Sequence, residues 1–165
     1  MEGLPFPDLH HARAAEGWLD LGVIDEAQIE LEKLSPSAGF VPDVLDLHWR
    51  LRSARLDWEG SLSIAERVIA LAPERANGWI HRSFALHELR RTQEARDNLL
   101  KAVELFPDQS IIPYNLACYA CQLGDLDTAR KWLRRALKLK GIEHLREMAM
   151  DDPDLAPLRA EIAQW

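Results

Sequence analysis

Apolar residues recur at helical spacing through residues 76–109, in two stretches joined by a short polar turn. The apolar stripe of the first stretch is Trp79, Phe84, Leu86 and Leu89, and that of the second is Ala95, Leu99, Ala102, Val103 and Leu105. This spacing predicts two amphipathic helices, and Pro107 ends the second one. A hairpin of two short helices cannot bury both stripes alone, so the unit needs neighbouring helices.

Small and apolar residues return along the chain at a step of about 34 residues, which is the length of a two-helix repeat. At this step lie the small residues Ala27, Ser61, Ala95 and Ala129, then the pair Ala102 and Ala136. Leucines recur in the same way in two series: Leu31, Leu99 and Leu133, and Leu71, Leu105 and Leu139. Such a period, with small residues where helices cross, is typical of a helical solenoid. The sequence therefore predicts an all-α solenoid of stacked antiparallel helix pairs.

These residues resemble the pattern of the tetratricopeptide repeat, which expects large, small and proline residues at fixed positions. Residues 76–109 match it at Trp79, Ser83, Ala95, Leu99, Ala102 and Pro107. Residues 110–141 match it at Leu116, Ala117, Ala129, Leu133 and Ala136, with Gly124 at the turn between the helices. The first repeat fits at Ala15, Trp18, Gly22, Ala27 and Leu31. The second departs most, because Trp49 stands where a small residue is expected and Ser61 replaces the middle alanine.

The resemblance implies a right-handed tetratricopeptide-repeat superhelix in one domain, residues 1–165. Its expected repeats are residues 8–41, 42–75, 76–109 and 110–141, followed by capping helices in residues 142–165. The helices are expected near residues 8–21, 25–34, 43–57, 61–71, 74–90, 92–106, 110–123, 125–140 and 142–150. Asp8 is the expected N-cap of the first helix, and Asp152-Pro153 is expected to start a last helix that runs through Ile162.

Charge and composition exclude several classes of function. The net charge of −7 offers no electrostatic attraction for nucleic acid, whose binding depends on neutralising phosphates. The acidic excess lies in residues 1–72, with 13 acidic and 6 basic side chains, whereas residues 73–165 hold 14 of each. No apolar run approaches the roughly 20 residues of a membrane span. The N-terminus lacks the pattern of a signal peptide and there are only two cysteines, so we expect a cytoplasmic protein.

The resemblance also implies where a partner would bind, because the first helix of each repeat lines the concave groove in this family. The groove residues expected here are Asp46, Arg50, Asn77, Ile80, Phe84, His87, Tyr114, Cys118, Cys121 and Gln122. The C-terminal half of this set is apolar and aromatic, which suits a short peptide or helix with apolar anchors. The best-known clamp of the family binds an acidic C-terminal tail and needs lysines, an arginine and asparagines at fixed repeat positions. In this sequence other residues stand at the positions that would have to supply the charges, so we exclude the clamp.

Cys118 and Cys121 are spaced to lie on one side of a helix, where they could share a metal or act as a redox pair. A zinc site needs four ligands and no second pair stands at a regular spacing, although His81, His87 and His144 could approach in space. A redox pair gains a low thiol pKa at a helix N-terminus, whereas these cysteines fall later in their helix. We therefore interpret both as small groove or packing residues, with metal binding and redox chemistry as alternatives.

The sequence carries no Gly-rich phosphate loop, no HExxH and no GxSxG motif, so we expect neither an enzyme nor a cofactor. The basic run from Arg130 to Lys140 is expected on a solvated helix face, because Leu133 and Ala136 are needed for packing. The predicted function is a non-catalytic module that binds a peptide or helix of a partner protein. The alternative is a self-associating scaffold, which would use its convex face or its incomplete first repeat.

Overall fold

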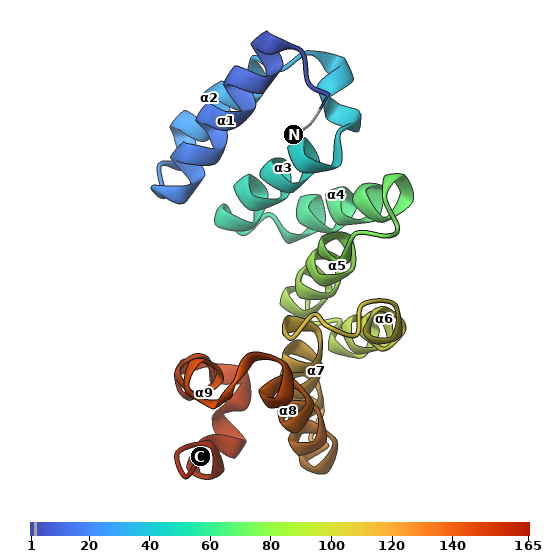
Figure 1. The fold of residues 1–165 in the computed structure, drawn as a ribbon, viewed down its shortest axis with the longest axis vertical. Coiled ribbons are helices and arrows are strands. Elements are labelled where there is room, and N and C mark those ends of the chain that lie inside the picture. Colours follow the sequence, from blue (N-terminus) through green and yellow to red (C-terminus); the bar gives the residue numbers. More distant parts are fainter. Residues whose placement is uncertain (2) are drawn as a thin grey trace. The chain divides into compact units, whose positions relative to one another are not determined.

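The computed structural model describes residue 1 and residues 3–165, apart from the side chains of Lys140, Ile142 and Glu143. All its regular elements are helical (Figure 1). In chain order they are α1 (Phe6–Asp20), α2 (Ile24–Glu32), η1 (Pro36–Phe40), α3 (Pro42–Ala54), α4 (Trp58–Leu71), α5 (Ala76–Glu88), α6 (Thr92–Leu105), α7 (Ile111–Gln122), α8 (Leu126–Lys140), α9 (Ile142–Asp151), η2 (Pro153–Leu158) and α10 (Arg159–Ile162). The helices pair as predicted, so the fold class, an all-α solenoid of helix pairs, is confirmed.

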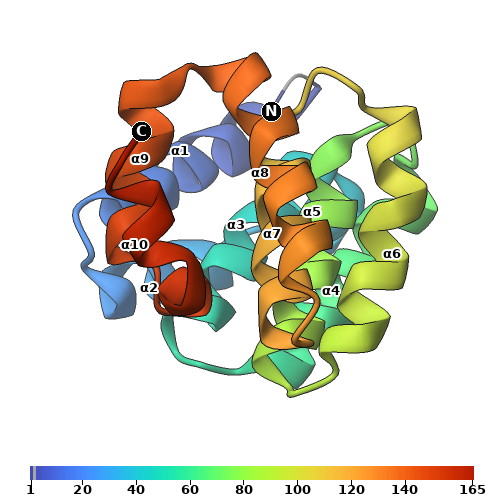
Figure 2. The same cartoon turned by 90° about the horizontal axis from the view of Figure 1, so that it is seen from below.

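The chain divides into two compact units, Met1–Ala85 and Leu86–Trp165. In the N-terminal unit α1 packs on α2 and α3 packs on α4. In the C-terminal unit α7 lies beside both α6 and α8, and η2 packs on α7 (Figures 1 and 2). Whether residues 1–165 act as one domain stays a prediction.

The small residues that recur through the sequence lie in the core. Ala27, Ser61, Ala95 and Ala129 are all fully buried. Ser61 can replace alanine because its hydroxyl donates to the carbonyl oxygen of Asp57 at 2.8 Å, so no buried donor is left unpaired. Small side chains at these four positions let the helix backbones approach one another closely.

Some positions assigned to the apolar stripes are exposed. Leu71, Leu105 and Leu139 form the second leucine series, and between 40% and 58% of each side chain is exposed. They lie in the last turn of α4, α6 and α8, beyond the buried residues of each helix. Phe84, placed in the first stripe, is 38% exposed as well. The expectation that Leu105 is buried in the second stripe was wrong. Phe84 is expected both in the first stripe and among the groove residues, and its binding of a partner stays a prediction.

Asp8 is not the N-cap of α1, which begins two residues earlier after Pro5. Asp8 lies within α1, and its side chain is buried. It accepts hydrogen bonds from the backbone N–H of Ser35 at 2.8 Å and from the Ser35 hydroxyl at 2.5 Å. These bonds lower the pKa of the Asp8 carboxyl. Asp8 thus fixes the end of the first repeat against its beginning.

Four turns carry the 34-residue period into the backbone. The turn after the first helix of each pair holds one residue with a positive φ: 72° at Gly22, 57° at Leu56, 63° at Arg90 and 83° at Gly124. Glycine adopts this left-handed conformation freely, whereas a side chain makes it costly. The second and third repeats therefore hold strained turns at Leu56 and Arg90.

Replacing Leu56 by glycine is expected to stabilise the chain by about 1 kcal/mol, because it relieves that strain. Leu56 is 71% exposed, so little packing is lost. Leu21 is the matched control: it is 72% exposed but has φ −83°, so glycine there should destabilise by about 0.5–1 kcal/mol. Urea unfolding of both variants measures the difference. Equal destabilisation by the two substitutions would contradict the strain.

Candidate functional site

Helices α3 and α5 present the predicted groove residues of the N-terminal unit. Asn77, His81 and Phe84 are spaced by four and three residues on α5, so they share one face of it. Gly78 lets α5 approach α4, since a Cβ at Gly78 would lie 3.0 Å from side-chain atoms of Val68 and Ile69. We call the residues Asp46, Trp49, Asn77, His81 and Phe84 the α3–α5 surface.

Aromatic rings form the apolar part of the α3–α5 surface. Trp49 stacks on His81 with 3.8 Å between ring centroids and 6° between the planes. Phe84 meets Trp49 edge-on at 6.2 Å and Trp58 at 5.7 Å. Each such pair contributes about 0.5–1.5 kcal/mol beyond the area it buries. Phe84 is therefore held by its neighbours while more than a third of its side chain faces solvent.

Three polar atoms of the α3–α5 surface lack hydrogen-bond partners. Among the described side chains, Asp46 Oδ1, Trp49 Nε1 and His81 Nδ1 are buried without a hydrogen bond. The Asp46 and His81 atoms are 3.6 Å apart, too far for a good hydrogen bond. The other Asp46 oxygen lies 3.4 Å from the Asn77 amide and 3.7 Å from the guanidinium of Arg75.

Burial sets the protonation of this cluster. It lowers the pKa of His81 to about 4, so the ring is neutral at pH 7. It raises the pKa of the Asp46 carboxyl, although Asn77 and Arg75 oppose that shift. An unpaired buried polar group costs about 1–3 kcal/mol, so this cluster is a place where the fold gives up stability.

The remaining predicted residues of the N-terminal unit are less central. Arg50 donates to the carboxylate of Asp20 on α1 at 2.6 Å. Ile80 is only partly exposed. Neither contacts the aromatic cluster through an observed polar or ring interaction.

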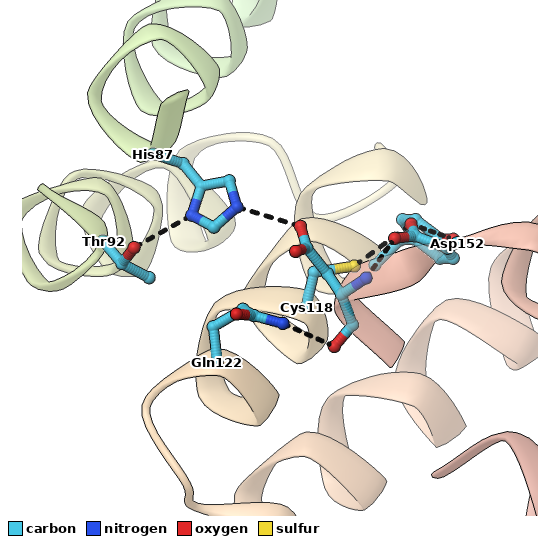
Figure 3. A network of polar contacts seen from close by, with 7 residues as sticks. His87, Thr92, Cys118, Gln122 and Asp152 are labelled. Atoms are coloured by element: carbon cyan, nitrogen blue, oxygen red, sulfur yellow. Dashed lines mark hydrogen bonds and ion pairs between the residues drawn. The ribbon is translucent and has the colours of Figure 1, made fainter. Parts of the chain in front are cut away.

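In the C-terminal unit the predicted groove residues lie on α7, except His87, which lies at the end of α5 (Figure 3). Tyr114, Cys118 and Cys121 are no more than 5% exposed. The phenol of Tyr114 donates to Asp152 Oδ2 at 2.7 Å, and the thiol of Cys118 donates to the same oxygen at 3.6 Å. The chain's own residues 152–158, here called the C-terminal segment, thus cover this surface.

His87 and Gln122 hold the next part of the C-terminal segment (Figure 3). His87 Nε2 lies 2.9 Å from Asp154 Oδ2, and His87 Nδ1 lies 2.9 Å from the hydroxyl of Thr92. The amide of Gln122 donates to the backbone oxygen of Asp154 at 3.2 Å. We call His87, Tyr114, Cys118, Cys121 and Gln122 the α7 surface.

The cysteines do not have the properties of a redox pair. Burial, followed by the charges of Asp152 and Asp154, raises the pKa of both thiols, whereas a reactive thiol needs a lowered pKa. Both cysteines are free. Within the described residues no group of three or more His, Cys, Asp or Glu side chains is placed to hold a metal ion.

Residues of both surfaces lie, as predicted from the sequence, on the first helices of their pairs. Trp49 and His81 were not predicted as members of the α3–α5 surface, although the misfit of Trp49 to the repeat pattern was a signal. Asp152 and Asp154 were not predicted as partners of the α7 surface. Asp152 was correctly expected as an N-cap, and it accepts from the backbone N–H of Asp154 at 2.9 Å. No sequence feature indicated that one carboxylate would serve both the cap and α7.

Comparison with known proteins fits this architecture. Residues 76–109 and 114–142 match the family model of the tetratricopeptide repeat. These two stretches are tetratricopeptide repeats. The resemblance inferred from the sequence is confirmed, and the first of these matches has the boundaries predicted for the third repeat. The tetratricopeptide-repeat fold is that of a protein-interaction module in general.

Solved structures with this fold cover nearly the whole chain. PilF of Pseudomonas aeruginosa has a TM-score of 0.77 at 18% identity, covering 96% of this chain and 70% of its own. TTC0263, a thermophilic tetratricopeptide-repeat protein of Thermus thermophilus, has a TM-score of 0.73 at 18% identity, covering 95% and 97%. MamA has a TM-score of 0.71 at 14% identity, covering 81% and 78%. At these identities the likeness concerns the fold alone. No curated protein matches the sequence.

Among the described helices, none combines the length and the apolar character needed to cross a bilayer.

Proposed function

We propose that this tetratricopeptide-repeat chain is a non-catalytic module that binds a peptide or helix of a partner protein on the α3–α5 surface. The observation that carries the proposal is Phe84, an exposed side chain fixed edge-on between Trp49 and Trp58. Binding hot spots are commonly aromatic residues of this kind, because a rigid ring buries a large apolar area with little loss of side-chain freedom.

The unpaired atoms of Asp46, Trp49 and His81 support the same site. Buried polar groups without partners are rare in native proteins, and functional sites are among the places where they occur. A partner that shields the rings from water would strengthen any hydrogen bond formed there. Phe84 would then supply the apolar anchor, and Asn77 and Asp46 would supply polar contacts at its edge.

Phe84→Glu is expected to abolish partner capture, because a carboxylate cannot enter an apolar pocket of the partner without losing its hydration. The matched control is Leu71→Glu, since Leu71 is 47% exposed on α4 of the same unit and has no part in the surface. Affinity capture from native lysate, followed by mass spectrometry, compares both variants with the wild type.

The variants must first show wild-type helicity and melting. We expect at least a tenfold loss of the captured partner with Phe84→Glu and little loss with Leu71→Glu. A partner retained equally by both variants would place binding elsewhere on the chain. Tyr114, the aromatic groove residue predicted on α7, stays unchanged in this test because it is buried and its substitution would disturb folding.

Self-association is a second candidate function, favoured by apolar exposure around the turn between α1 and α2. Trp18, Leu21 and Val23 are 36%, 72% and 38% exposed there. A second copy of the chain could cover them. Self-association predicts a molecular mass that rises with concentration in light scattering and falls back with Leu21→Lys. A monomer at all concentrations would exclude it.

A further inference from the structure

The C-terminal segment, residues 152–158, contacts the α7 surface in the way a bound peptide contacts its receptor. Its two leucines, Leu155 and Leu158, are at most 1% exposed. The carboxylates of Asp152 and Asp154 are both held by side chains of the α7 surface, which here takes the part of the receptor (Figure 3). Asp152 is the N-cap of the short helix η2, and Asp154 lies in the first turn of η2.

Asp152 is held by donors that carry no charge. Burial raises the pKa of the Tyr114 phenol and of the Cys118 thiol, and the nearby carboxylate raises each further. Both groups therefore keep their protons at pH 7 and donate to Asp152 Oδ2. The other oxygen, Oδ1, accepts from the backbone N–H of Asp154, so both oxygens of Asp152 are occupied.

Asp154 is held through its side chain and its backbone. When the hydroxyl of Thr92 donates to His87 Nδ1, the proton on Nε2 is donated to Asp154 Oδ2. Gln122 donates to the Asp154 carbonyl oxygen. The α7 surface thus contacts two carboxylates and one backbone carbonyl of the C-terminal segment, and the leucine that follows them is fully buried.

These contacts define the chemistry of a ligand. Every acceptor in the set comes from three consecutive residues, Asp-Pro-Asp, and every side-chain donor comes from the receptor. None of these contacts requires the ligand to belong to the same chain. A separate peptide with two aspartates one residue apart, followed by leucine, could make all of them.

We propose that the α7 surface is a binding site for acidic partner peptides of the pattern Asp-Pro-Asp-Leu, and that residues 152–158 are its built-in occupant. A tethered occupant acts at an effective concentration in the millimolar range, so a partner peptide must compete with it. The α7 surface shares no residue with the α3–α5 surface, so a negative result at one surface leaves binding at the other untouched.

Fluorescence anisotropy with the full chain tests the proposal. The probe is a labelled peptide of residues 151–159, Asp-Asp-Pro-Asp-Leu-Ala-Pro-Leu-Arg. We expect weak binding to the wild type and at least a tenfold tighter Kd for Asp154→Ala, because losing a hydrogen bond to a carboxylate weakens the built-in occupant. A peptide with asparagine in place of the aspartates that correspond to Asp152 and Asp154 should bind the Asp154→Ala variant at least tenfold more weakly than the unchanged peptide does. Adding His87→Ala should remove the gain.

The proposal is overturned if the wild type and Asp154→Ala bind the peptide equally. It is also overturned if the asparagine peptide binds as tightly as the aspartate peptide. Circular dichroism checks the fold of each variant. If Asp154→Ala is unfolded, Asp154→Asn, which keeps the shape of the side chain and loses its charge, decides by the same comparisons. Leu139→Ala, on the exposed side of α8, is the control that should bind like the wild type.

Discussion

Acidification is expected to destabilise the wild-type chain more than it destabilises the His81→Phe variant. Burial lowers the pKa of His81 in the folded chain to about 4, whereas an unfolded chain binds the proton near pH 6.5. Above pH 6.5 both states are neutral at this residue, so protonation of His81 contributes nothing to the free energy of unfolding. Between pH 6.5 and pH 4 only the unfolded state gains the proton, and the free energy of unfolding falls. The full loss is about 3 kcal/mol.

His81→Phe keeps a ring beside Trp49 and removes the titrating group. Asp46, which faces His81, has a raised pKa and therefore acts in the opposite direction as the pH falls. The difference between wild type and variant isolates the histidine. Urea unfolding between pH 7 and pH 4 should show two curves that separate below pH 6.5. Parallel curves would mean that His81 is solvated in the folded chain.

Truncating Leu155 is the second change with a large expected effect. Leu155 is fully buried, so Leu155→Ala should weaken the packing of the C-terminal segment by about 3 kcal/mol. The segment covers Tyr114 and Cys118, and local opening would expose the thiols. Because 1.4 kcal/mol corresponds to a factor of ten, we expect Cys118 and Cys121 to react about a hundredfold faster with a thiol reagent in native buffer.

The matched control for Leu155→Ala is Leu139→Ala, which removes the same atoms from a side chain that is 40% exposed. It should leave thiol labelling unchanged. Mass spectrometry counts the labels on intact protein over time. Equal labelling rates for the two variants would show that the C-terminal segment does not protect the cysteines. Proteolysis of the same samples would map where the chain opens.

The repeat period accounts for how much of the fold could be predicted. Ala27, Ser61, Ala95 and Ala129 stand at helix crossings, and a small side chain is required wherever two backbones approach. Helix boundaries followed from prolines, turns and caps, and α7, for example, is within one residue of its predicted ends. Asp8 failed as a cap because its carboxylate found buried partners at Ser35, far away in the sequence.

The sites were less predictable, for physical reasons that differ between the two surfaces. At the α3–α5 surface the sequence showed a misfit, Trp49, but not that its ring would stack on His81. At the α7 surface the repeat pattern named Tyr114 and Cys118 as groove residues. Their burial depends on residues 152–158, which lie outside the repeats, and the contact between them is not periodic. The periodic residues thus predict the stacked helices, whereas the two surfaces depend on residues that do not follow the repeat period.

Photo-crosslinking at position 84 tests the central claim, that the α3–α5 surface binds a partner, most directly. A benzophenone amino acid replaces Phe84 in one variant and Leu71 in the other, two exposed apolar side chains of the same unit. After irradiation in native lysate, the account predicts a discrete adduct from position 84, lost when His81 and Trp49 are both changed to alanine, and none from position 71. The same adduct from both positions, or a captured partner that never crosslinks at position 84, would contradict it.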